Sequence, residues 1–161
     1  MIFTDIYAAY VIDEAKAMAG CGVVVFCSPD DVRVYYREFA YPLGNSSAFL
    51  CALQTVRLAL SGILPKFRKV STTVFVDSDI LRILMMDTER LVAMCSSDNE
   101  MTALSEMMKW VELYPAIEFR AATIDEYIIR ARRLATDAIT AEKSFDSETS
   151  ITNAYTHRED H

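Results

Sequence analysis

Three apolar runs rich in β-branched and aromatic residues lie within the first 41 residues, and they limit the fold more than any other feature. Residues 2–11, 21–26 and 32–41 each have the composition of a β-strand, and SPDD (28–31) has that of a hairpin turn. Runs joined by short polar segments pair as antiparallel strands. The N-terminal part of the chain is therefore predicted to form three antiparallel strands.

After Pro42 the pattern alternates between helix and strand. Ser97 with Glu100, and Thr123 with Glu126, each form a capping box that marks a helix start. The expected elements are a helix at 46–61, a strand at 72–79, a short helix at 80–86, an irregular or helical connection at 87–97, a helix at 97–114, a strand at 116–122 and a last helix from 123. This order predicts an α/β domain at residues 1–143 with five strands. The polar residues 144–161 are predicted to be a flexible tail.

Composition excludes several classes of protein. The 161 residues suit one domain, and a hydrophobic fraction of 52% is typical of a folded globular protein. The formal net charge of −7 disfavours a broad phosphate-binding surface, so nucleic acid is not an expected partner. No apolar stretch is long enough to cross a membrane. Local basic patches, such as the arginines of the last helix, remain compatible with this charge.

The cysteines indicate the cellular compartment, and the positions of the histidines limit the kinds of catalytic or metal site that the domain can have. The four cysteines include no C-x-x-C pair, and most lie in apolar runs, which is typical of buried thiols in a reducing compartment. No secretory signal is recognisable, so a cytoplasmic or host-cell intracellular location is expected. The two histidines, His157 and His161, both lie in the predicted tail. The predicted domain therefore has no histidine for a catalytic triad or a zinc site.

Two aspartates interrupt or follow apolar strands. Asp5 lies in MIFTDIYAAY and Asp77 in STTVFVDSDI. A buried carboxylate is costly unless it is hydrogen-bonded, paired or bound to a cation. Three interpretations stay open: polar residues satisfied by backbone donors and water, a single weak magnesium site, or a working two-metal site.

The order of elements and several segments resemble the ribonuclease H-like family. IFTD is similar to the strand that carries the first aspartate of that family, GCGVVVF to its second strand and VFVDSD to its fourth. GNSSAFLCAL and IDEYIIRARRLA are similar to its first and last helices. The resemblance implies a mixed five-stranded sheet, made of three hairpin strands followed by parallel βα units, with helices on both faces.

Active members of the family hold two magnesium ions with four carboxylates and hydrolyse a phosphodiester bond. The resemblance places Asp5 and Asp77 at the first-strand and fourth-strand aspartates, on adjacent parallel strands with their carboxylates close together. It places the first-helix glutamate at Phe49 and the last-helix aspartate at Ile129. The family's loop histidine has no counterpart. Two of four ligands are therefore expected to survive, and the resemblance implies a member without nuclease activity.

Methionine and aromatic residues suggest a surface for other proteins. Six of the eight methionines lie between residues 85 and 108. Such clusters fill irregular cores or make adaptable binding surfaces. The candidate binding residues are Phe49, Met107, Trp110, Tyr114 and Ile129.

The expected function is thus a non-catalytic protein–protein adaptor, of a kind that a phage or virus would use to recruit or sort proteins, with self-association included. No cofactor is expected, apart from weak magnesium binding at Asp5 and Asp77. The alternative is a divergent magnesium-dependent nuclease or Holliday-junction resolvase-like enzyme that uses these two aspartates.

Overall fold

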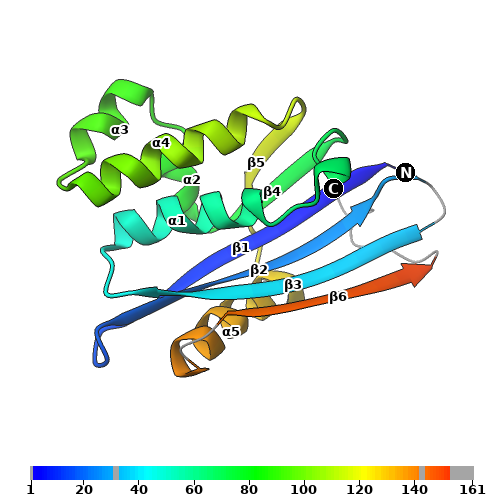
Figure 1. Cartoon of the computed structure of the whole chain (residues 1–161), viewed down its shortest axis with the longest axis horizontal. Coiled ribbons are helices and arrows are strands. Elements are labelled where there is room, and N and C mark those ends of the chain that lie inside the picture. Colours follow the sequence, from blue (N-terminus) through cyan, green and yellow to red (C-terminus); the bar gives the residue numbers. More distant parts are fainter. Residues whose placement is uncertain (1, 31–32, 142–143, 153–161) are drawn as a thin grey trace.

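The computed structural model describes residues 2–30, 33–141 and 144–152. Within these residues six strands form one mixed sheet, in the order β5-β4-β1-β2-β3-β6 (Figure 1). β1, β2, β3 and β6 pair in antiparallel fashion, and β4 and β5 run parallel to β1. The elements are β1 (Phe3–Asp13), β2 (Met18–Ser28), β3 (Arg33–Gly44), α1 (Ala48–Ser61), the 3₁₀ turn η1 (Pro65–Phe67), β4 (Thr72–Val76), α2 (Ser78–Leu84), α3 (Thr88–Met94), α4 (Asp98–Glu112), β5 (Ile117–Ala121), α5 (Glu126–Ala141) and β6 (Phe145–Thr152). The predicted α/β class and the change from hairpins to parallel βα units are confirmed.

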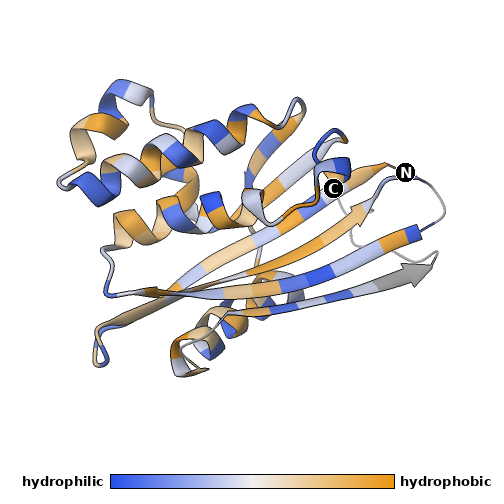
Figure 2. Cartoon of the chain, viewed as in Figure 1, coloured by the Kyte–Doolittle hydropathy of each residue, from blue (hydrophilic) through white to orange (hydrophobic). Residues whose placement is uncertain are grey.

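The sheet has a helical layer on each face. α1, α2, α3 and α4 lie on one face and α5 lies on the other (Figure 1). Side chains alternate along β1, so that Ile6 and Ala8 join the core beneath α1 while Phe3, Tyr7 and Ala9 join the core beneath α5. Figure 2 shows hydrophobic residues along the inner strands and on the inward sides of the helices. The apolar runs of β1 and β2 are therefore buried on both sides, as their composition requires.

Two glycines in β2 let α5 approach the sheet closely. A Cβ atom at Gly22 would lie 2.0 Å from the carbonyl oxygen of Ala131, and one at Gly20 would lie 2.3 Å from that of Ala135. Real Cβ atoms do not approach backbone oxygens this closely, so no larger residue fits without a shift of the helix. These contacts set the position of α5 relative to β1, β2 and β3.

Two helix starts illustrate where capping patterns hold and where they fail. Ser97 caps α4 by accepting from the Glu100 amide, so the predicted helix start is confirmed, but the Glu100 carboxylate accepts from the backbone and side chain of Ser96 instead of the Ser97 amide that completes a capping box. At α5 the predicted box is wrong, because the Asp125 carboxylate accepts from the amides of Tyr127 and Ile128. Thr123 and Ile124 therefore precede the helix. Ile124 is 85% exposed rather than part of the apolar face.

The sixth strand is the main departure from the predicted topology. Residues 145–152, predicted as part of a flexible tail, form β6 and pair with β3 from Arg33↔Thr152 to Ala40↔Phe145. The segment FDSETSIT has large apolar residues only at Phe145 and Ile151, so its composition gives a weak strand signal, and β3 supplies the hydrogen-bonding edge with which it pairs. Residues 153–161, including both histidines, lie outside the described residues. Of the helices that the structure describes, none is both long enough and apolar enough to cross a membrane.

Candidate functional site

Asp77 lies where β4 ends and α2 begins. It occupies the N-cap position of α2, but its side chain makes no capping bond. It accepts instead from Arg132 of α5, at 2.6 Å between Asp77 Oδ1 and Arg132 Nη2. This ion pair is part-exposed, and it ties the end of β4 to the helix on the far face of the sheet.

Asp79, in the first turn of α2, is bound by a tyrosine from β1. The Tyr10 hydroxyl donates to Asp79 Oδ2 at 2.5 Å. Burial, and then the bond and charge of Asp79, hold the pKa of Tyr10 well above its ordinary value. The charge of Asp77 acts in the same direction. Tyr10 therefore stays protonated and remains a hydrogen-bond donor to Asp79.

Asp5 is not part of this group. It is 1% exposed and lies opposite Thr73 of β4, whereas Val76, the last residue of β4, lies opposite Ala8. Asp77 is thus four residues farther along the strand direction than the partner of Asp5, a separation of about 13 Å at a strand's rise per residue. The predicted adjacency of two parallel strands is confirmed. The predicted closeness of the two carboxylates is wrong, because the register between β1 and β4 separates them.

The two apolar residues predicted at ligand positions, Phe49 and Ile129, differ in solvent exposure. Phe49 of α1 is half-buried and packs against the core on its side of the sheet. Ile129 of α5 is 38% exposed and lines a shallow surface hollow with Arg132, Arg133, Thr136 and Asp137. Cys51 of α1 is fully buried, and burial raises the pKa of its thiol to about 11. The buried thiol is therefore neutral and adds no anionic ligand.

The remaining candidate binding residues divide into core and surface. Met107 and Tyr114 are buried, and the Tyr114 hydroxyl donates to the carbonyl oxygen of Leu60. The prediction that these two residues contact a partner does not fit their burial. Trp110 is half-buried, and the Arg68 guanidinium lies 4.8 Å from its ring centroid.

The donor set does not fit a pair of magnesium ions. Among the described residues no three His, Cys, Asp or Glu side chains converge in a way that could hold a metal. Asp77 and Asp79 already bind Arg132 and Tyr10, and Asp5 lies too far along the sheet. The arrangement at the end of β4 is a protein-internal polar network.

Arg132 and Tyr10 are the site residues that the sequence did not identify. The sequence pattern groups Arg132 with Arg130 and Arg133 as a basic flank of the last helix, yet Arg130 and Arg132 each bind a carboxylate, Glu38 and Asp77. Their partners are far away in the sequence, so spacing along the helix carries no sign of them. Tyr10 shares the alternation of Ile6 and Ala8, which points it toward α1 and α2. That alternation is the only available signal.

The comparisons with known proteins show the fold. No protein-family model matches the chain, and no curated protein matches it in sequence. Solved structures do match. LC9-RNase H1, a type 1 RNase H with the type 2 active-site motif, has a TM-score of 0.69 and 17% identity, covering 91% of this chain and 78% of its own.

Two further structures match over most of their length. The N-terminal RNase H domain of Rv2228c from Mycobacterium tuberculosis has a TM-score of 0.61 and 16% identity, covering 88% of this chain and 96% of its own. RNase H1 from the halophilic archaeon Halobacterium salinarum has a TM-score of 0.59 and 12% identity, covering 86% and 98%. At these identities the likeness is one of fold. The chain therefore has an RNase H-like fold, extended by the C-terminal strand β6.

Proposed function

We propose that this chain is a non-catalytic, RNase H-like binding module that acts as a protein–protein adaptor. The observation that carries the proposal is the ion pair between Asp77 and Arg132, at 2.6 Å. A two-metal nuclease needs its carboxylates free to bind the cations that stabilise the attacking and leaving oxygens. Here a guanidinium, which keeps its charge at every physiological pH, already bonds to the carboxylate at the end of β4.

The neighbouring groups support the same proposal. Asp79 accepts from a tyrosine hydroxyl that burial keeps protonated, so one of its oxygens is engaged. Magnesium requires several oxygen ligands in near-octahedral geometry. Neither Cys51 nor Ile129 adds an anionic oxygen near Asp77. A role in recruiting or sorting proteins, in a phage or viral setting, belongs to the same proposal.

Exposed methionines at the ends of α2 and α3 and on α4 supply a candidate surface for a protein partner. Met85, Met94 and Met101 are 77%, 44% and 42% exposed, and these helices lie together at one end of the molecule (Figure 1). Exposed methionines form adaptable interfaces, because the thioether chain is flexible and polarisable. We define these three residues as the methionine surface. Phe49 and Ile129 stay in the proposal as partly exposed apolar residues outside it.

The alternative function is a divergent metal-dependent nuclease. What favours it is the likeness of fold to RNase H1 enzymes, which at under 20% identity is a likeness of scaffold. It would require Arg132 to release Asp77 when a cation and substrate bind.

The adaptor proposal is tested by comparing the proteins that wild-type and variant chains capture. Met85→Glu with Met94→Glu should remove a specific set of captured proteins, because charges at the centre of an apolar interface are costly. Ala15→Glu with Thr140→Glu, in the exposed turn between β1 and β2 and at the end of α5, adds the same charge elsewhere and is the matched control. The captured set should survive raised salt, unlike phosphate binding. A set that both double variants retain, or that salt alone removes, would contradict the proposal.

A further inference from the structure

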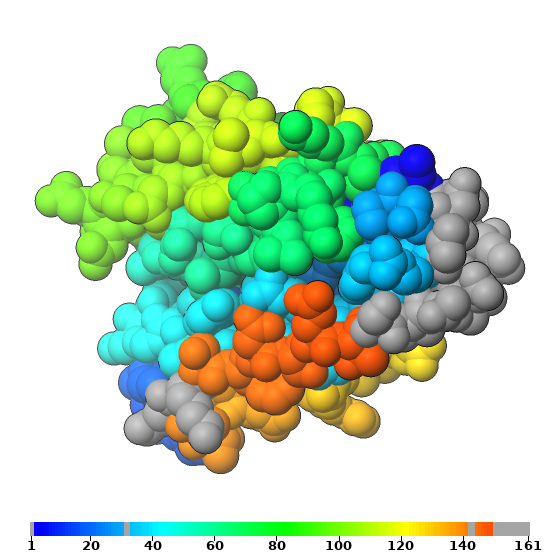
Figure 3. Space-filling model, turned by 45° about the vertical axis from the view of Figure 1, so that its right-hand side comes forward, coloured from blue at the N-terminus to red at the C-terminus, as the bar shows by residue number. Residues whose placement is uncertain are grey.

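The described side chains of β6 contribute little to either core. The described side chains of β6, residues 145–149, are exposed, and Phe145 is 45% exposed. Among residues 145–149 none is a member of either core cluster, and Phe145 lines a surface hollow beside Leu134 and Ala138 of α5. Figure 3 shows the strand running along the surface of the molecule. The strand is held chiefly by its backbone ladder with β3, and such a ladder with little hydrophobic burial is marginally stable.

The strand that receives β6 is, by contrast, anchored in the protein. Val34, Phe39 and Ala40 of β3 are buried, and β3 pairs with β2 along most of its length. Detachment of β6 would therefore leave β3 folded, with its outer row of backbone donors and acceptors open. Such an edge is a template for pairing with another extended segment.

Charge complementarity makes this edge specific for an acidic strand. The Arg37 guanidinium donates to both carboxylate oxygens of Asp146, at 3.1 and 2.5 Å. Arg37 also donates to the carbonyl oxygen of Gly62 and lies 4.8 Å from the Phe39 ring centroid, so it has contacts that do not involve β6. Glu148 lies opposite Arg37 in the register.

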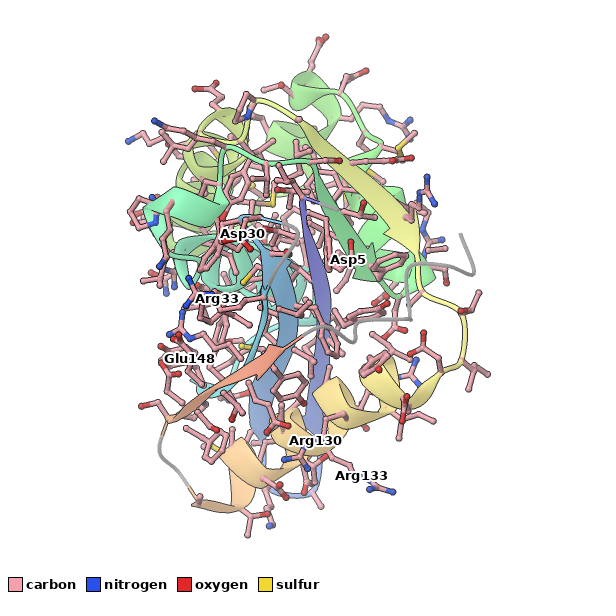
Figure 4. The ribbon with its side chains drawn as sticks, turned by 90° about the vertical axis from the view of Figure 1, so that its right-hand side faces the viewer. Asp5, Asp30, Arg33, Arg130, Arg133 and Glu148 are labelled. Atoms are coloured by element: carbon pink, nitrogen blue, oxygen red, sulfur yellow. The ribbon has the colours of Figure 1, made fainter. Side chains whose placement is uncertain are left out.

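The surface beside Arg37, around Tyr35 of β3, is also basic. Arg33 and Lys66 lie 5.8 and 5.5 Å from the centroid of the Tyr35 ring. Figure 4 shows Arg33 and Glu148 on the same side of the molecule, at the margin formed by β3 and β6. The basic residues Arg33, Arg37 and Lys66 belong to the body of the protein. The acidic residues Asp146 and Glu148 belong to β6.

We infer that the outer edge of β3 is a strand-accepting site, and that residues 145–152 of two copies of this chain exchange, each pairing with the β3 edge of the other. The segment that is seen to fit this edge is the chain's own, and a second copy supplies the identical segment. Reciprocal exchange keeps the ladder and the Arg37–Asp146 pair and closes with twofold symmetry. The inference does not depend on the proposed function.

A charge-exchange experiment tests the inference with full-length protein. In Arg37→Asp the introduced carboxylate would face Asp146 within one chain. In Asp146→Arg the introduced guanidinium would face Arg37, so each variant alone repels its own β6. In an equimolar mixture every pairing between the two variants is of opposite charge. The mixture should form a heterodimer, seen by native mass spectrometry, at a level at least about tenfold above the dimer of either variant alone.

The double variant Arg37→Asp/Asp146→Arg is the matched control. It restores an opposite-charge pair within one chain, and its monomer–dimer distribution should equal that of the wild type. A mixture that stays monomeric would overturn the inference. So would equal amounts of dimer in the mixture and in either variant alone, because the contact would then lie elsewhere.

A second measurement leaves Arg37 and its contacts with Gly62 and Phe39 unchanged. The Asp146→Arg chain keeps the native β3 edge and repels its own strand. A synthetic peptide of residues 144–152 should therefore bind it, while the same peptide carrying Asp146→Arg should bind at least about tenfold more weakly. Equal binding of both peptides, or binding of neither, would overturn the inference.

Discussion

Arg130 and Arg132, two residues apart on α5, bind carboxylates from β3 and from the end of β4, which lie on opposite sides of the two central strands. Arg130 donates to both oxygens of Glu38 on β3, at 2.9 and 2.7 Å, while Arg132 donates to Asp77 after β4. Residues two apart on a helix point in different directions, so neighbouring arginines serve separate partners. The sequence predicts only a solvated basic flank, because which carboxylate lies beneath each arginine depends on how α5 crosses the strands.

Glu38 is a carboxylate whose protonation should lower stability. Bonds from Arg130, and to a smaller extent from the Tyr36 hydroxyl, hold the pKa of Glu38 below its ordinary value, although burial acts in the opposite direction. A pKa lowered by folding stabilises the protein above the ordinary carboxyl pKa, and this contribution is lost as pH falls through the folded-state pKa. Stability should therefore fall on acidification below about pH 4.

Glu38→Gln should lower the free energy of unfolding at pH 7 by about 1–2 kcal/mol, since a charge-assisted pair is lost. It should also make stability less dependent on pH in the acid range, as measured by urea unfolding. Glu118→Gln is the control. Its pair with Arg120 is exposed on both sides, so the change should stay within about 1 kcal/mol. An acid dependence identical in Glu38→Gln and the wild type would contradict this account of Glu38.

At the scale of elements, the contact between α5 and β2 fixes the architecture most rigidly. Gly22 and Gly20 are the points where the helix backbone meets the strand, and Ala131 and Ala135 face them from the helix. Because small residues occur on both sides, the helix and the sheet pack closer than ordinary side chains permit. Arg130 and Arg132 reach Glu38 and Asp77 from this position.

Gly22→Ala should lower the free energy of unfolding by at least about 2 kcal/mol, because the added methyl group collides with the Ala131 carbonyl and α5 must move. Gly44→Ala is the comparison. Gly44 has φ +67° with open space around it, so the same substitution there adds only backbone strain of about 1–2 kcal/mol. Urea unfolding of both variants measures the difference. If Gly22→Ala costs no more than Gly44→Ala, the close packing of α5 is not what stabilises this layer.

Elements with a distinctive apolar pattern were predictable, and those without one were not. β1, β2 and β3 were recognisable because their runs are apolar and β-branched, although the turn at residues 14–17 lets β1 and β2 extend farther than those runs. β6 was missed because its composition gives only a weak strand signal. The prediction that the carboxylates of Asp5 and Asp77 lie close together failed for another reason. Which residues of parallel strands lie opposite each other is set by long-range packing, and a motif within each strand does not record it.

At the scale of the whole molecule, an RNase H-like scaffold holds an internal polar network where strand β4 meets α2. Arg132 and Tyr10 bind the two aspartates there, and the methionine surface and the β3 edge lie elsewhere on the molecule. The chain is acidic, with a formal net charge of −7, which opposes a broad contact with phosphates. These features are the basis of the proposal that the chain works by binding other proteins.

Cleavage of a labelled RNA–DNA hybrid with Mg²⁺ or Mn²⁺ is the most direct measurement of whether the chain is non-catalytic. We expect no cleavage above the metal-free control from the wild type, and none from Arg132→Ala, in which Asp77 is released but the other ligands are still missing. Asp77→Asn is the control for contaminating nuclease, because a contaminant is indifferent to this change. Metal-dependent cleavage by the wild type that Asp77→Asn abolishes would contradict the account and establish the chain as a nuclease.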